Sequence, residues 1–162
     1  MTISTFATSH VRVETAKAFA EVTSDFERQL GKFDPTVLQT LRPNAERTDV
    51  RARIEAMAGS SGLMLFDTID HGTILTILGE KQKAIQYVLG NPLIAIQMTQ
   101  HNLAAGLYAP LRVLIYEDES GRTRLEYDKP SSLFSQFNDD RIASVASLLD
   151  QKVEELVVAA VA

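Results

Sequence analysis

The sequence lacks cysteine and tryptophan altogether, and its 162 residues include only three histidines. Without cysteine there is no disulfide, no thiolate nucleophile and no thiolate metal ligand. No apolar run approaches the roughly 20 residues of a membrane-spanning helix. The first residues also lack the basic segment and apolar run of a signal peptide. We therefore expect a cytoplasmic protein with no membrane partner.

Charge and composition further limit the kinds of protein that this sequence can be. The net charge is −5, with 21 acidic and 16 basic residues, and no basic run concentrates positive charge. A field of this sign repels phosphate backbones, so we expect no nucleic-acid partner. Apolar residues make up 45% and charged residues 23% of the chain, as in ordinary globular proteins. The length fits one domain covering residues 1–162.

Alternation of apolar and polar residues predicts the strands of this domain. Turn residues separate the predicted segments, which are 6–13, 63–70, 84–89, 111–117 and 122–127. The last two form a hairpin whose turn contains Gly121, a residue that adopts the positive φ of a tight reversal without strain.

Apolar residues at helical spacing predict three main helices, at 15–30, 93–102 and from Asp139 or Asp140 to 158. Thr15 is the expected N-cap of the first helix, and Gly31 its stop. Two prolines break the segment 32–62, which we interpret as a helical insertion with short helices at 36–41 and 45–58. The periodicity of 74–79 does not distinguish helix from strand.

The predicted order is strand, helix, insertion, four strands and a final helix. Strands gather in the middle of the chain, and the long helices lie at its ends. This order favours the α+β class, with an antiparallel sheet covered by helices on one face.

Asp70 and His71 are neighbours at the predicted end of a strand. A carboxylate beside an imidazole can orient the ring and raise its basicity. The alternative is that Asp70 accepts hydrogen bonds from turn amides, for which its short side chain suits it, while His71 packs.

Met98 and His101 share one face of the predicted helix 93–102, because they are three positions apart. With His71 they would supply one thioether and two imidazoles, a ligand set that suits copper or haem iron. The alternative is that Met98 fills the core.

Other chemistry finds little support in the sequence. Neither G-x-S-x-G nor H-E-x-x-H occurs, and the paired acids at 118–119 and 139–140 suit a turn and a helix cap. Tyr116 and Tyr127 lie on adjacent predicted strands, where we expect them to share a face. They would then either line a pocket or pack as ordinary sheet residues.

Several segments, in order, resemble the DUF302 family. They are Ile69-Asp70-His71-Gly72, Gly90-Asn91-Pro92, a short helix with Met98, Ala109 to Asp118, Gly121, Tyr127 and Pro130. The resemblance implies a β-α-β4-α fold with a curved antiparallel sheet, similar to the TT1751-like superfamily, and homodimers. Two departures are the long segment 32–62 and Thr73, where a small apolar residue is expected.

The resemblance marks candidate ligand-binding positions, but no reaction and no known cofactor. These positions are Asp70, His71, Asn91, Met98 and Tyr116. Asn91 before Pro92 suits a sharp turn, or else an amide aimed into a pocket. We expect the imidazole of His71, the amide of Asn91 and the thioether of Met98 to surround one hollow.

Three functions follow from these residues. The first is a module that binds a small-molecule ligand or a metal-containing cofactor. The second is a small cofactor-independent enzyme that uses His71 as acid or base. The third is a homodimeric interaction subunit, suggested by the apolar tail from Leu156 to Val161, which should be covered by something.

Overall fold

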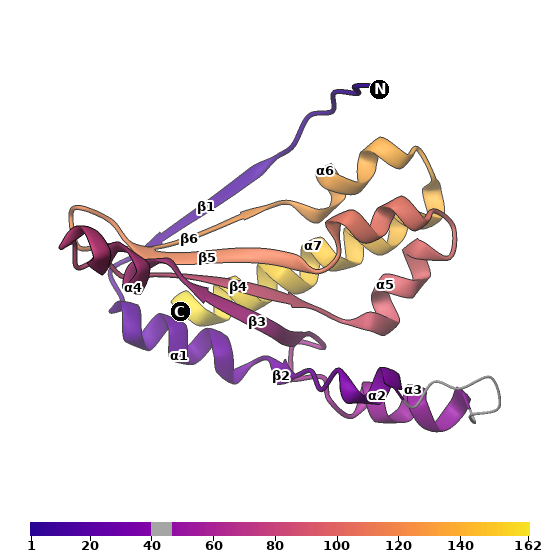
Figure 1. The fold of residues 1–162 in the computed structure, drawn as a ribbon, viewed down its shortest axis with the longest axis horizontal. Coiled ribbons are helices and arrows are strands. Elements are labelled where there is room, and N and C mark those ends of the chain that lie inside the picture. Colours follow the sequence, from indigo (N-terminus) through magenta and orange to yellow (C-terminus); the bar gives the residue numbers. More distant parts are fainter. Residues whose placement is uncertain (40–46) are drawn as a thin grey trace.

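A computed structural model describes residues 1–39 and 47–162. Across these residues the strands form one six-stranded sheet in the order β1-β6-β5-β4-β3-β2 (Figure 1). The strands are β1 (His10–Thr15), β2 (Gly31–Lys32), β3 (Met64–Asp70), β4 (Ala84–Gly90), β5 (Leu111–Glu117) and β6 (Thr123–Asp128). All neighbours are antiparallel except β2 and β3. The fold confirms the predicted α+β class with its curved sheet.

The short strand β2 was not predicted, because two residues carry no periodicity. Gly31 pairs with Met64 of β3 instead of ending the first helix. A side chain at Gly31 would collide with the main-chain oxygen of Met57, so glycine allows the close approach of the two segments here.

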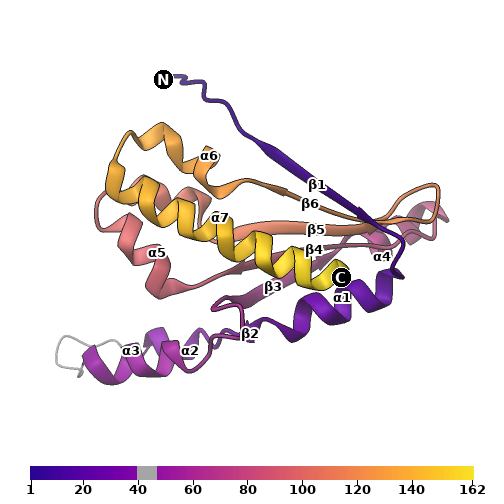
Figure 2. The ribbon, with the colours of Figure 1, turned by 180° about the vertical axis from the view of Figure 1, so that it is seen from behind.

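Two helices cover one face of the sheet, α1 (Phe19–Arg28) and α7 (Asp140–Val161), as Figure 2 shows. The helix α1 begins four residues later than predicted, because Thr15 pairs with Thr123 and so extends β1. Its first turn is closed by Glu21, whose carboxylate accepts a hydrogen bond from the N–H of Ala18 at 3.2 Å. The predicted cap of α7 is confirmed, since Asp139 accepts from the N–H of Arg141 at 2.9 Å.

The predicted insertion packs with the start of β3 in a second, small hydrophobic cluster. The insertion contains α2 (Thr36–Gln39) and α3 (Arg47–Glu55), which extend beyond the end of the sheet in Figure 1. The buried members of this cluster are Val37, Val50, Ile54 and Met64. Portions of the predicted helices 36–41 and 45–58 lie outside the described residues.

The remaining helical segments follow the strand ends. Of the segment 74–79, all but Gly79 is helical, within α4 (His71–Leu75) and the 3₁₀ helix η1 (Thr76–Leu78). Between β4 and β5 lie α5 (Pro92–Thr99) and η2 (Leu103–Tyr108). After β6 come α6 (Pro130–Phe134) and η3 (Ser135–Phe137).

The two faces of the sheet differ in character. Residues of the face toward α1 and α7 are buried, among them Val113, Ile115, Leu125 and Tyr127. The opposite face carries charged and polar side chains. No helix layer of the described residues covers it (Figures 1 and 2). Tyr116 belongs to this open face and Tyr127 to the buried one. The prediction that the two tyrosines share a face is therefore wrong, because Tyr116 pairs with Arg124, which lies three positions from Tyr127, and an odd separation places side chains on opposite faces.

Candidate ligand-binding site

The strands β5 and β6 separate before they reach their ends. Their ladder runs from Glu117–Thr123 to Leu114–Glu126 and then stops. Continuing the same register would place Arg112 opposite Asp128, but these residues are not paired. A gap therefore opens between two strands in the middle of the sheet.

An aromatic cluster lies beside this opening. Tyr108 precedes β5, and its ring centroid lies 6.2 Å from that of Phe134 and 6.1 Å from that of Phe137, both of which follow β6. The chain segments that enter β5 and leave β6 thus diverge to enclose three rings. Packing of large rings between the two segments accounts for the separation of the strands.

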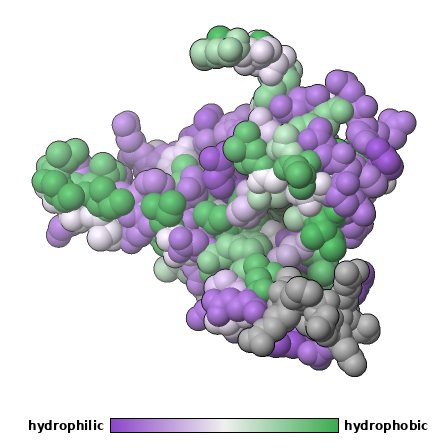
Figure 3. Space-filling view, turned by 45° about the vertical axis from the view of Figure 1, so that its right-hand side comes forward, coloured by the Kyte–Doolittle hydropathy of each residue, from purple (hydrophilic) through white to green (hydrophobic). Residues whose placement is uncertain are grey.

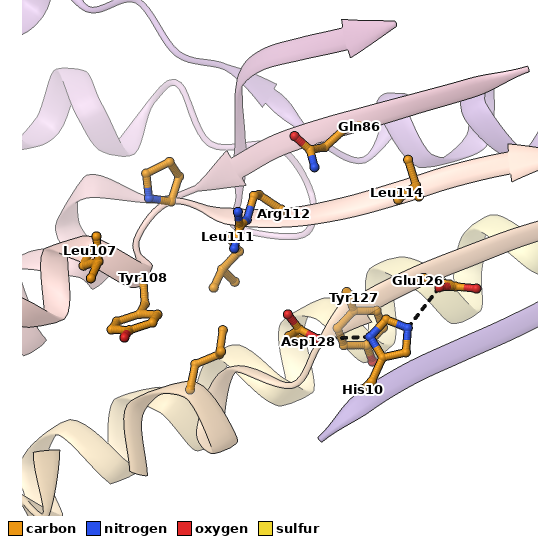
Figure 4. Close-up of a pocket in the computed structure, with 12 residues that line it drawn as sticks. His10, Gln86, Leu107, Tyr108, Leu111, Arg112, Leu114, Glu126, Tyr127 and Asp128 are labelled. Atoms are coloured by element: carbon orange, nitrogen blue, oxygen red, sulfur yellow. Dashed lines mark hydrogen bonds and ion pairs between the residues drawn. The ribbon is translucent and has the colours of Figure 1, made fainter. Parts of the chain in front are cut away.

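The gap forms a hollow of about 300 Å³, which we call the cleft. Figure 4 shows Arg112 of β5 and Asp128 of β6 on opposite sides of it, with Tyr108 at its wide end. The residues lining it are His10, Gln86, Leu107, Tyr108, Pro110, Leu111, Arg112, Leu114, Glu126, Tyr127, Asp128 and Leu133. This volume is at the lower end of the range for small-molecule sites.

Glu126 is the centre of a polar network at the closed end of the cleft. Its carboxylate accepts hydrogen bonds from the hydroxyl of Tyr116 at 2.6 Å, Nε of Arg12 at 2.5 Å and Nε2 of His10 at 3.0 Å. Burial raises the pKa of Glu126, but these three partners outweigh it and hold the pKa at about 2. Glu126 is therefore a fixed, ionised member of the network.

The second carboxylate of the cleft is also paired. Oδ1 of Asp128 lies 3.0 Å from Nδ1 of His10 (Figure 4). The hydrogen bonds with Asp128 and Glu126 raise the pKa of His10 above its ordinary value. The imidazole thus lies between two carboxylates, and its charged form neutralises some of their charge.

Arg112 differs from these groups. Its side chain is exposed and lines the cleft. Within residues 1–39 and 47–162, no carboxylate forms an ion pair with it. Gln86 of β4 also lines the cleft, and its side-chain amide has no hydrogen-bond partner within the same residue ranges. The cleft therefore contains a cation and an amide that are available to a ligand.

A larger and more open hollow of about 600 Å³, which we call the shelf, continues along the open face below α4. Gln86, Leu114 and Glu126 line both the shelf and the cleft. The predicted site residues His71 and Tyr116 lie on the shelf. Two of the predicted positions thus belong to the surface that includes the cleft.

Asn91 and Met98 line a third hollow, at the opposite end of β4. This hollow of about 240 Å³ is almost entirely apolar, and Met98 is completely buried. The side chain of Asn91 is used within the chain, since it caps α5 through the N–H of Leu93 and donates to the main-chain oxygen of Gly62. The turn interpretation of Asn91 therefore fits the structure.

The expectation that His71, Asn91 and Met98 surround one hollow is wrong. The antiparallel pairing of β3 and β4 places Asp70 beside Ile85 at one end of β4 and Met64 beside Gly90 at the other. Seven residues of β4 therefore separate His71 from Asn91. Of the three proposed metal ligands, His71 is separated in the same way from Met98 and His101, which both follow the far end of β4. Among the residues described, no group of three His, Cys, Asp or Glu side chains is arranged to hold a metal ion.

Asp70 caps α4 instead of orienting His71. Its carboxylate accepts from the N–H of Thr73 at 2.8 Å and from the hydroxyl of Thr73 at 2.6 Å. These hydrogen bonds lower the pKa of Asp70. Thr73, which departs from the expected small apolar residue, is thus the partner that occupies Asp70. The Asp-His pair of the enzyme hypothesis is not formed.

The apolar tail that suggested a dimer is covered by its own chain on one side, while Val158 on its other side is 55% exposed. Leu156, Val157 and Ala160 are buried in the main core. A different apolar surface is exposed at the tip formed by α4 and η1, visible as a green group at the left of Figure 3. Ile77 and Leu78 are 83% and 76% exposed there.

Sequence reasoning missed the residues of the cleft, although a signal was present. In β1 and β6 every second residue is charged or histidine, and these residues are His10, Arg12, Glu14, Arg124, Glu126 and Asp128. Such alternation predicts one polar face on each strand. Because β1 and β6 are far apart in sequence, the pattern does not reveal that the two polar rows are neighbours.

Comparison with known proteins fits this two-layer α+β architecture. A solved structure titled as an uncharacterised conserved DUF302 protein from Bacillus stearothermophilus superposes with a TM-score of 0.66 at 16% identity. The match covers 93% of this chain and 97% of that one. The family model described as "Domain of unknown function DUF302" matches residues 39–160. The chain therefore belongs to the DUF302 family.

Curated proteins match this chain over part of their own length. Two proteins named fluoride-specific ion channel FluC 1, from Brucella suis and Brucella abortus, are each 27% identical over 140 residues. The matches cover 82% of this chain, which spans about half the length of these relatives, 54% and 50%. Across residues 1–39 and 47–162, no helix has the length and apolar character needed to cross a bilayer.

Proposed function

We propose that this protein is a binding domain for a small molecule, which occupies the cleft between β5 and β6. The observation that carries the proposal is the early end of the β5–β6 ladder, which leaves a hollow of about 300 Å³ in the open face of the sheet. A gap in a sheet exposes main-chain groups that would otherwise be paired, and a ligand can satisfy them.

The chemistry of the lining supports binding. The cleft combines charged and polar side chains with leucine and proline side chains, so it offers both polar and apolar contacts to a small molecule. The pairing of its acidic groups gives a fixed arrangement, because His10 and Tyr116 hold Glu126 from two strands. Such a pre-formed site lowers the entropic cost of binding. We do not assign channel activity to this chain, because its identity to the fluoride channels is low and it spans about half their length.

The test begins with native mass spectrometry of freshly purified protein and a thermal-shift screen of small molecules. A bound compound should raise the melting temperature, since a ligand at 100 times its Kd stabilises the folded state by about 2.7 kcal/mol. A Leu114→Trp variant then localises the site, because Leu114 lines the cleft where it closes. Leu148→Trp is the control, since Leu148 lies exposed on α7.

We expect Leu114→Trp to abolish the thermal shift and Leu148→Trp to retain it, with circular dichroism showing both variants folded. Protein that is always bare and that no compound stabilises would contradict the proposal. Equal binding by wild type and a folded Leu114→Trp variant would also contradict it.

A further inference from the structure

The geometry points to a small organic monocarboxylate as the ligand, with its carboxylate held by Arg112 and its apolar body by the walls of the cleft. This inference rests on the proposed function, because it assigns a ligand class to the same cleft. Arg112 is singled out by a comparison of the charged groups that line the cleft.

The acidic groups already have cationic partners. Glu126 pairs with Arg12 at 2.5 Å, and Asp128 pairs with His10 at 3.0 Å. The guanidinium of Arg112 is the lining cation that pairs with no carboxylate among the described residues. A ligand that brings one negative charge would therefore complete the charge balance of the cleft, and a planar guanidinium matches a carboxylate in a bidentate manner.

Main-chain geometry adds a donor beside this cation. The N–H of Asp118 donates to the oxygen of Arg122 at 2.9 Å, which identifies 118 and 122 as a hydrogen-bonded pair of the hairpin. In an antiparallel ladder such pairs alternate, so the N–H of Arg112 is directed toward β6. The ladder has already ended there. The main chain of Arg112 thus faces the gap, as its side chain does.

The number of negative charges on the ligand is limited by the same residues. Glu126 and Asp128 lie on the far wall of the cleft, opposite Arg112 (Figure 4). A phosphate monoester, with nearly two negative charges, would meet two carboxylates and, among the described residues, one cation without a carboxylate partner, and like charges repel. A carboxylate brings a single charge. The distribution therefore favours a monocarboxylate over a phosphate.

The wide end of the cleft receives an apolar group. Its walls there come from Leu107, Tyr108 and Leu133. Leu107 is 80% exposed, so a ligand would cover an apolar surface that water now contacts. The ring of Tyr108 offers a flat face to an aromatic or alkyl body (Figure 4).

The test compares matched probes by isothermal titration calorimetry at pH 7 and low salt. Benzoate and hexanoate carry the charge, benzamide and hexanol lack it, and phenyl phosphate replaces the carboxylate. We expect the carboxylates to bind at least tenfold more tightly than their neutral counterparts and than phenyl phosphate. Arg112→Gln should weaken carboxylate binding at least tenfold, and Arg112→Lys should retain some of it.

Arg51→Gln is the control, because Arg51 lies on α3, exposed, and lines none of the hollows described above. Because Arg112 is exposed, its replacement should leave the fold intact, which circular dichroism verifies. As a second measurement, the Nε–H resonance of Arg112 should shift when benzoate is added to the wild type.

The outcomes separate the two proposals. If a neutral probe binds as tightly as its carboxylate, and Leu114→Trp abolishes that binding, the ligand class is wrong while the binding function stands. Tighter binding of phenyl phosphate, or unchanged carboxylate binding by Arg112→Gln, also overturns the ligand class. If no compound from this set or from the wider screen binds, both proposals fail.

Discussion

Arg112 and Asp128 would be cross-strand neighbours if the register of β5 and β6 continued, but the ladder ends at Leu114 and Glu126, before it reaches them. Opposite charges on facing positions normally attract and stabilise a sheet. Here Asp128 pairs with His10 of β1 instead. The sheet thus exchanges one cross-strand ion pair for an open cleft in which the guanidinium of Arg112 has no carboxylate partner among the described residues.

The hydrogen bond between Tyr116 and Glu126 should stabilise the closed end of the cleft. Tyr116→Phe removes the hydroxyl that donates to Glu126 at 2.6 Å, and we expect a loss of about 1–2 kcal/mol in the free energy of unfolding. Urea denaturation measures this loss. Tyr108→Phe is the control, because its hydroxyl contacts Gln136 at 3.4 Å only. Equal losses in the two variants would contradict the assigned role of Glu126.

The ionised state of Glu126 predicts how stability depends on pH. Its pKa is about 2 in the folded protein and about 4.5 in the unfolded chain. A carboxylate with a lowered folded pKa contributes stability above its unfolded pKa, and this contribution is lost as the pH falls through the folded pKa. Wild type should therefore exceed Glu126→Gln in melting temperature above pH 4.5. The difference should shrink steadily toward pH 2, and a constant difference would contradict the prediction.

His10 should titrate above its ordinary pKa because of its partners on β6. Asp128 and Glu126 both bond to its ring, and Arg12 of its own strand shares Glu126. Since the folded pKa is raised, the contribution of His10 to stability is complete below pH 6.5 and is lost as the pH rises through the folded value. NMR titration of the ring should show a lower pKa in Asp128→Asn than in wild type. An unchanged pKa would show that Asp128 is not the main cause.

Asp70 and His71 should behave differently when replaced. Asp70→Ala removes the acceptor for the N–H of Thr73, so hydrogen exchange at this amide should accelerate by about tenfold. His71→Ala should leave that exchange rate unchanged, because the Asp70 carboxylate bonds to Thr73 and not to the imidazole. A comparable acceleration of exchange in His71→Ala would contradict this prediction and indicate that Asp70 and His71 interact.

Much of the fold could be predicted from local patterns, while the site could not. The hairpin β5–β6 and the cap of α7 at Asp139 follow from alternation, a turn glycine and a capping carboxylate within a few residues of each other. Gly121 adopts φ of 78°, as the predicted turn requires. These features depend on neighbours in sequence, so the sequence contains the information that determines them.

The prediction that the site residues lie together required the distances between them in space, and the sequence does not contain these distances. His71 and Asn91 are both close to strand ends, but they flank opposite ends of β4, because a connection and a strand lie between them. His10 and Asp128 are 118 positions apart and yet bond directly. The order of the strands in the sheet, and not the residue pattern within each strand, decides which polar residues come into contact.

The amino-acid sequence by itself determined the α+β class, the helix and strand periods and the polar alternation of β1 and β6, since each arises from residues within one turn or one strand pair. Only the tertiary structure decided that β5 and β6 separate beyond Leu114 and that Arg112 has no carboxylate partner among the described residues. The reason is that Tyr108, Phe134 and Phe137 come from separate segments, and their packing, which no local pattern encodes, holds the two strands apart.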